Sequence, residues 1–113
     1  MAGYRGGMGG AQGMQNLMKQ AQKMQEEMRE TEALLDDWEI VGTAGGEAVV
    51  VYMNAKKKID GIEIDKSVID PEDEEMLEDL ILAAINDGYK KADAVFEEKM
   101  GKFGGLGGMG GLL

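Results

Sequence analysis

The chain contains neither cysteine nor histidine among its 113 residues. The lack of cysteine excludes disulfides, and the lack of both residue types excludes the common zinc sites. Nucleophilic catalysis by a serine–histidine or cysteine–histidine pair is excluded as well. We therefore expect a protein that is not an enzyme, binds no cofactor or metal ion and takes no small-molecule substrate.

Long apolar runs are also scarce. The longest, residues 80–85, is far shorter than the roughly 20 residues of a membrane-spanning helix. The first residues are rich in glycine and do not form the apolar segment of a secretory signal. We expect a cytoplasmic protein without a membrane partner.

Basic residues are outnumbered by acidic ones, 12 to 22, which gives a net charge of −10. The excess acid lies in the middle: residues 26–88 hold five bases and nineteen acids. Residues 1–25 hold Arg5, Lys19 and Lys23 and no acid. Contact with nucleic-acid phosphates should therefore be confined to the basic ends and should be sensitive to salt.

Most of the 18 glycines lie near the two ends of the chain. Because ordering glycine costs backbone entropy, we expect flexible Gly-rich tails at residues 1–12 and 103–113, around one domain at residues 13–102. Residues 105–110 fit the dinucleotide-binding pattern G-x-G-x-x-G. No strand precedes this segment and no helix follows it, so we reject that interpretation.

A first helix is predicted from about Met14 to Asp36. Its apolar or small positions repeat with the 3-4 spacing of a heptad seam: Met14, Leu17, Ala21, Met24, Met28, Thr31 and Leu35. Such a seam packs against the same chain, against a second copy or against a partner helix. The small size of the core favours a homodimer.

Three strands are predicted at residues 38–44, 47–53 and 58–65, joined by short turns. Gly45-Gly46 is a strong turn signal, and short connections favour an antiparallel sheet in the order 1-2-3. The predicted fold class is α+β, a two-layer α-β-β-β-α arrangement with a three-stranded antiparallel sheet and two long helices.

A second helix is predicted to begin with Asp70 as N-cap and Pro71 at the first helical position, and to end near Gly101. Acidic residues crowd its first turn, where the helix dipole favours negative charge. These acids could also suggest a calcium or magnesium site. A calcium loop needs a glycine turn between spaced acids, so we favour a capping role.

Eight basic residues are candidates for DNA contact: Lys19, Lys23, Arg29, Lys56, Lys57, Lys58, Lys90 and Lys91. The alternative for each is an ordinary surface charge, and lysines in a turn also protect a strand edge. If both helices project from the sheet as an antiparallel pair, their basic ends meet at a shared tip. If they lie flat along the sheet, this grouping disappears.

Several segments of the chain resemble the YbaB/EbfC family of bacterial nucleoid-associated proteins. They are Leu17–Glu26, Gly42–Gly46, Ile62–Asp65, Ile69–Pro71 and Glu75–Leu80 through Ala92, and the similarity spans roughly residues 14–102. The resemblance implies a tweezer-like homodimer that binds double-stranded DNA through charged helical arms and acts in nucleoid organisation and gene regulation. It assigns DNA contact to Lys19 and Lys23, and less firmly to Lys90 and Lys91.

A second hypothesis stays open. A non-catalytic dimeric adaptor could recruit a protein partner through its Met-rich helix face and its acidic surface.

Overall fold

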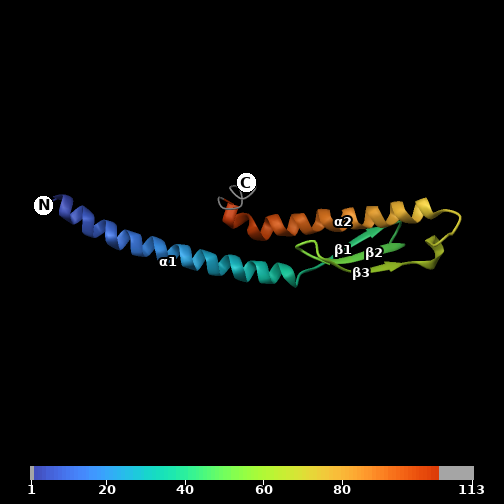
Figure 1. Cartoon of the computed structure of the whole chain (residues 1–113), viewed down its shortest axis with the longest axis horizontal. Coiled ribbons are helices and arrows are strands. Elements are labelled where there is room, and N and C mark those ends of the chain that lie inside the picture. The colour runs from blue at the N-terminus through green and yellow to red at the C-terminus, as the bar shows by residue number, and fades with distance from the viewer. Residues whose placement is uncertain (1, 105–113) are drawn as a thin grey trace.

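The computed structural model describes the backbone of residues 2–104 and the side chains of residues 12–104. In chain order the elements are α1 (Ala2–Asp36), β1 (Glu39–Ala44), β2 (Val49–Asn54), β3 (Ile59–Ile64), the short 3-10 helix η1 (Lys66–Val68), α2 (Glu74–Met100) and the 3-10 helix η2 (Gly101–Phe103). The predicted α+β class and the antiparallel strand order β1-β2-β3 are confirmed (Figure 1). Residues 105–113, with their glycine pattern, lie outside the described part.

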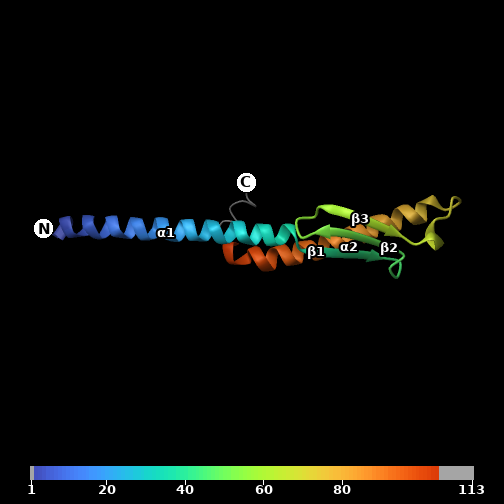
Figure 2. The ribbon, with the colours of Figure 1, turned by 90° about the horizontal axis from the view of Figure 1, so that it is seen from below.

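The molecule is long and narrow, 86 Å by 24 Å by 17 Å. On one face of the sheet α2 packs against β1 and β2, while α1 leaves the sheet and projects away from it (Figures 1 and 2). The sequence left two arrangements open, and the structure combines them: α1 projects from the sheet, whereas α2 lies along the sheet and only its end extends beyond it. α1 and α2 run in opposite directions, and the end of α2 lies beside the second half of α1.

The core lies between α2 and the inner face of the sheet. Alternate residues of β2 are buried, namely Val49, Val51 and Met53, with Ile40 beside them on β1. The matching face of α2 carries small residues at every fourth position, Ala84, Gly88 and Ala92, all buried. Small side chains at this spacing let a helix approach a sheet closely.

The closest approach of α2 to the sheet is at Gly42 on β1. A Cβ atom added to Gly42 would lie 2.5 Å from the backbone nitrogen of Gly88 and would also meet the carbonyl oxygen of Ala84. Backbone atoms cannot move aside as a flexible side chain does, so Gly42 fixes how α2 sits on β1.

Two helix starts differ from the sequence predictions. α1 begins at Ala2 rather than near Met14, because each added residue of an existing helix gains a backbone hydrogen bond, which offsets the glycine cost. The N-cap of α2 is Asp73 rather than Asp70, and its carboxylate accepts a hydrogen bond from Met76 N at 3.2 Å. Asp70 instead accepts from Glu72 N at 2.9 Å in the preceding turn. The predicted end of α2, at Gly101, is confirmed.

Candidate nucleic-acid interface

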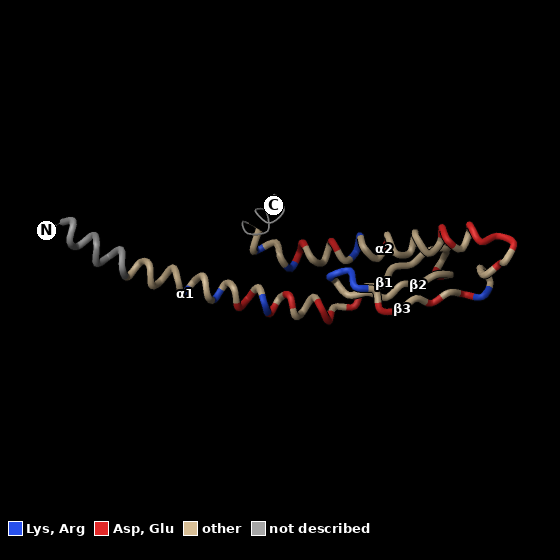
Figure 3. Tube along the Cα trace, in the orientation of Figure 1, with Lys and Arg blue, Asp and Glu red and all other residues tan. Residues whose placement is uncertain are grey.

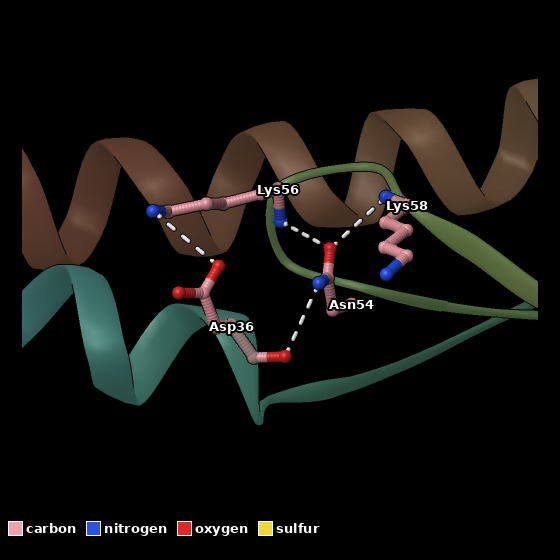
Figure 4. Close-up of polar contacts among 4 residues, drawn as sticks. All are labelled: Asp36, Asn54, Lys56 and Lys58. Carbon is pink, nitrogen blue, oxygen red and sulfur yellow. Dashed lines mark hydrogen bonds and ion pairs between the residues drawn. The ribbon is translucent and has the colours of Figure 1, made fainter.

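The junction between α1 and the sheet sets where the projecting helix points. Asn54 Oδ1 accepts hydrogen bonds from the backbone nitrogens of Lys56 (2.9 Å) and Lys58 (3.0 Å), and Asn54 Nδ2 donates to the carbonyl oxygen of Asp36 (3.1 Å) (Figure 4). Lys56 Nζ lies 3.3 Å from Asp36 Oδ1. We call this set the joint. It ties the end of α1 to the turn between β2 and β3.

The joint also has a backbone component. The carbonyl oxygen of Leu35 accepts hydrogen bonds from Trp38 N at 3.3 Å and from Ala55 N at 3.2 Å. Leu35 and Ala55 are almost completely buried. Lys57 in the same turn has a φ of +68°, in the left-handed region, and its backbone nitrogen donates to the carbonyl oxygen of Asn54 at 3.0 Å.

The apolar stripe of α1 is covered at its base and bare beyond it. Leu35 is fully buried, whereas Met24 is 42 % exposed and Leu17 is 64 % exposed. The change occurs where α2 ends, at the contact between Lys102 Nζ and Glu27 Oε2 (4.0 Å). We call residues 2–26, the part of α1 beyond this contact, the arm.

Lys19 and Lys23 are the basic residues of the arm whose side chains are described, and both are exposed. Each lies two positions from Ala21 of the apolar stripe, which is about 200° around the helix axis. They therefore share the face of the arm that points away from the stripe. Among the described side chains, neither lysine has a carboxylate within ion-pair distance.

The lysines of the turn between β2 and β3 lie beside α2 rather than on the arm. Lys57 Nζ forms an ion pair with Asp93 at 2.7 Å and lies 5.8 Å from the centre of the Tyr89 ring. Lys56 is the cation of the joint. Lys58 is exposed and makes no ion pair among the described residues.

Lys91 also has partners within the chain. Its Nζ lies 2.9 Å from Asp87 Oδ2 and donates to the carbonyl oxygen of Val41 at 3.1 Å, while the same carboxylate oxygen accepts from Thr43 N at 2.9 Å. Because β1 is an edge strand, these two side chains satisfy backbone groups at the edge of the sheet. The Thr43 N–H bond, followed by the Lys91 hydrogen bond, holds the pKa of Asp87 below its ordinary value.

The predicted DNA contacts therefore fall into two separate groups. Lys90 and Lys91 lie about ten residues before the end of α2, whereas Lys19 lies eight residues beyond Glu27, so the groups are roughly 30 Å apart along the helices. Arg29 lies between them on α1. The idea that Lys90 and Lys91 face Lys19 and Lys23 at a shared tip is wrong.

Lys99 and Lys102, which sequence reasoning did not select, are the lysines of α2 and η2 nearest to the arm. Lys102 contacts Glu27, and Lys99 Nζ lies 5.2 Å from the centre of the Trp38 ring. Their position in the last turns of a long helix that runs antiparallel to α1 was the available signal.

Acidic residues gather at the far end of the molecule from the arm, around the start of α2 (Figure 3). Within residues 12–104 they form no group of three or more that could hold a metal ion. Within the same described residues, no helix has the length and apolarity that crossing a membrane requires.

Comparisons with known proteins identify a family. A family model described as the YbaB/EbfC DNA-binding family matches residues 8–109. The chain is 47 % identical over 106 residues to a nucleoid-associated protein of Alkaliphilus metalliredigens, covering 94 % of this chain and 93 % of the relative. It is 52 % identical over 101 residues to a nucleoid-associated protein of Clostridium novyi, covering 88 % and 89 %.

Among solved structures, an uncharacterized protein of Helicobacter pylori matches with a TM-score of 0.66 and 28 % identity, over 80 % of this chain and 92 % of that one.

Proposed function

Because the chain belongs to the YbaB/EbfC DNA-binding family, we propose that it acts as a homodimer that contacts duplex DNA through its arms, in the cytoplasm at the nucleoid. Its role would be nucleoid organisation and gene regulation. The observation that carries this proposal is the pair Lys19 and Lys23. Both are exposed, unpaired among the described side chains, and turned away from the apolar stripe.

The apolar stripe supports self-association. Met14, Leu17 and Met24 are 65 %, 64 % and 42 % exposed, although they continue a stripe whose base is buried. A second copy of the chain would cover them through the heptad seam and remove about 25 cal/mol of unfavourable free energy per Å² of apolar surface. The lysines on the opposite face stay accessible to phosphate in such a dimer.

The charge distribution supports contact at the arm and not at the body. The acidic start of α2 repels phosphates, and Lys56, Lys57 and Lys91 already face carboxylates. Binding would rest on phosphate contacts rather than on base recognition, because a pair of lysines carries little sequence information.

A gel-shift titration of a short duplex across a salt series tests the proposal. We expect Lys19→Glu with Lys23→Glu to abolish the shift at physiological salt. The milder pair Lys19→Gln with Lys23→Gln should lower the slope of log K against log salt by about 0.9 for each phosphate contact removed.

The matched control is Lys66→Glu, which makes the same change of charge per site in η1, next to the acidic end of the molecule. This variant should bind like the parent. Equal losses in the arm and control variants, or no shift by the parent protein, would rule out the arm as the DNA-binding element. The second result would favour the adaptor hypothesis.

A further inference from the structure

The outer face of the sheet is not covered by any element of the described chain. α2 packs on the opposite face, and Figure 2 shows the three strands from the uncovered side. The strand register places Val41 beside Tyr52 and Gly61 on this face, and Thr43 beside Val50 and Glu63. Its centre is therefore apolar and half-buried.

The Tyr52 ring fills the space above Gly61. A Cβ atom added to Gly61 would lie 3.5 Å from Tyr52 Cδ2, which is ordinary van der Waals contact. An aromatic ring that covers a glycine on a neighbouring strand makes a smooth apolar floor. We call Val41, Thr43, Val50 and Tyr52 the floor.

Acidic residues surround the floor. Glu39 and Glu63 lie on the outer face of their strands, and Glu47 lies in the turn that joins β1 to β2; all three are exposed. Partial burial, followed by the charges of Glu63, Glu39 and Glu47, raises the pKa of Tyr52. We call these three glutamates the rim. The outward positions of β1, β2 and β3 carry no lysine or arginine.

The same face continues into a shallow hollow at the end of α1. Four carboxylates line it, from Asp36, Asp37, Glu39 and Asp60, together with Tyr52 and with Trp38, whose ring already faces Lys99. Asp36 is paired with Lys56, but the other three carboxylates have no ion-pair partner among the described residues. Carboxylates beside the Tyr52 side chain suit the cationic end of a lysine or arginine side chain.

We propose that this outer face is a docking surface for a basic amphipathic helix of a partner protein, whose apolar stripe covers the floor and whose lysines or arginines pair with the rim. The helix would form a third layer on the sheet, opposite α2. A strand of six residues spans about 20 Å, which matches a helix of roughly 14 residues.

Charge decides between this occupant and the others. DNA phosphates would meet only carboxylates on this face. Two copies of the chain packed face to face would place one acidic rim against another, with no lysine or arginine at the outward strand positions to pair with them. The arm of a second copy does not fit either, because Lys19 and Lys23 point away from its apolar stripe.

A labelled synthetic peptide of about 14 residues, with leucines at helical 3-4 spacing and lysines elsewhere, serves as the probe. Fluorescence anisotropy at about 0.1 M salt, where the Debye length is ≈ 10 Å, measures its affinity for the full chain. We expect binding of this peptide, none of a matched leucine–glutamate peptide, and at least tenfold weaker binding of a leucine–lysine peptide whose scrambled order removes the stripe.

Two charge-reversal variants locate the site. Glu39→Lys with Glu63→Lys should weaken binding at least tenfold. Glu72→Lys with Glu78→Lys, which makes the same change of net charge near the start of α2, should weaken it less than threefold. Val50→Lys should also weaken binding, because it places a charge on the floor.

Equal losses in the rim and control variants would overturn the proposal, since they would indicate general electrostatic attraction. So would the absence of peptide binding, or a change in the oligomeric state of the rim variant by light scattering, which would make this face a contact between copies. The gel shift with DNA should be unchanged in the rim variant, so the result is independent of the proposed function of the arm.

Discussion

The body and the arm both carry apolar residues and lysines, but these side chains have more contacts in the body than in the arm. In the body, residues 27–104, the apolar stripe of α1 is half-buried at Met28 and fully buried at Leu35, and three lysines have carboxylate partners at 3.3 Å or less. In the arm, the same heptad stripe continues without cover, and Lys19 and Lys23 have no partner among the described side chains. Availability for binding is therefore set by neighbours and not by residue type.

The largest expected effect is in the body, at Gly42. Gly42→Ala should lower the free energy of unfolding by about 3 kcal/mol or more, because its Cβ atom would meet the backbone of Ala84 and Gly88. Urea denaturation measures the loss. Gly88→Ala is the matched control: its Cβ atom meets the flexible end of Met53, and the gain in helix propensity offsets part of the cost. A loss below about 1 kcal/mol for Gly42→Ala would mean that α2 can shift on β1.

The next effect compares two leucines of one stripe. Leu35→Ala should cost about 3 kcal/mol of stability, since Leu35 is fully buried at the base of α1. Leu17→Ala should change the stability of the monomer by less than about 0.5 kcal/mol, because Leu17 is 64 % exposed.

If the arm packs against a second copy, Leu17→Ala should also raise the dissociation constant of the dimer at least tenfold, measured by light scattering over a dilution series. Leu82→Ala, at a site that is 58 % exposed on α2, is the control. An unchanged dimer in the Leu17 variant would remove the stripe from the interface.

Asn54→Ala should weaken the joint, which connects α1 to the sheet. The variant loses the three hydrogen bonds of the joint made by this side chain, at a cost of about 2 kcal/mol in urea denaturation. Asn54→Asp keeps the acceptor oxygen and should lose about half as much.

Because the chain has no cysteine, spin labels at Gln22→Cys and Glu97→Cys report the angle of the arm directly. Their distance distribution should broaden in Asn54→Ala and change little in Asn54→Asp. Identical distributions in all three proteins would mean that the backbone hydrogen bonds of Leu35 alone set the direction of α1.

The smallest expected effect is the pH dependence of the body. The pKa of Asp87 is lowered in the folded state, so its contribution to stability is fully present above its unfolded value, near pH 4, and is lost as the pH falls through the folded value. Asp87→Asn should be slightly less stable at neutral pH and should equal the parent in strong acid. A stability difference that persists at low pH would assign the effect to packing instead of charge.

Local patterns in the sequence were enough to predict the sheet. Alternating and β-branched segments, the Gly45-Gly46 turn and the short connections fix three antiparallel strands, because each of these signals acts over a few residues. The 3-4 stripe likewise predicts that α1 has one apolar face. The end of α2 at Gly101 follows from the loss of that periodicity.

Contacts between distant residues could not be predicted in the same way. Lys57 meets Asp93 and Lys91 meets Val41 only because α2 folds back over the sheet. The N-cap of α2 is Asp73 and not the predicted Asp70, although both aspartates precede the apolar positions of the helix. Asp70 caps the turn that contains Pro71, so α2 begins only after that turn. The lysines can be selected from the sequence, but only the tertiary structure shows which of them form ion pairs with carboxylates.

The length of α1 gives the joint a mechanical consequence. A continuous helix of 35 residues extends about 52 Å from its attachment, so it behaves as a lever with the Asn54 turn as its fulcrum. A rotation of about 10° at that turn would carry the far end roughly 9 Å sideways, a distance comparable to the ≈ 12 Å width of a DNA major groove. Ångström-scale adjustments beside the sheet would thus become nanometre-scale changes in reach.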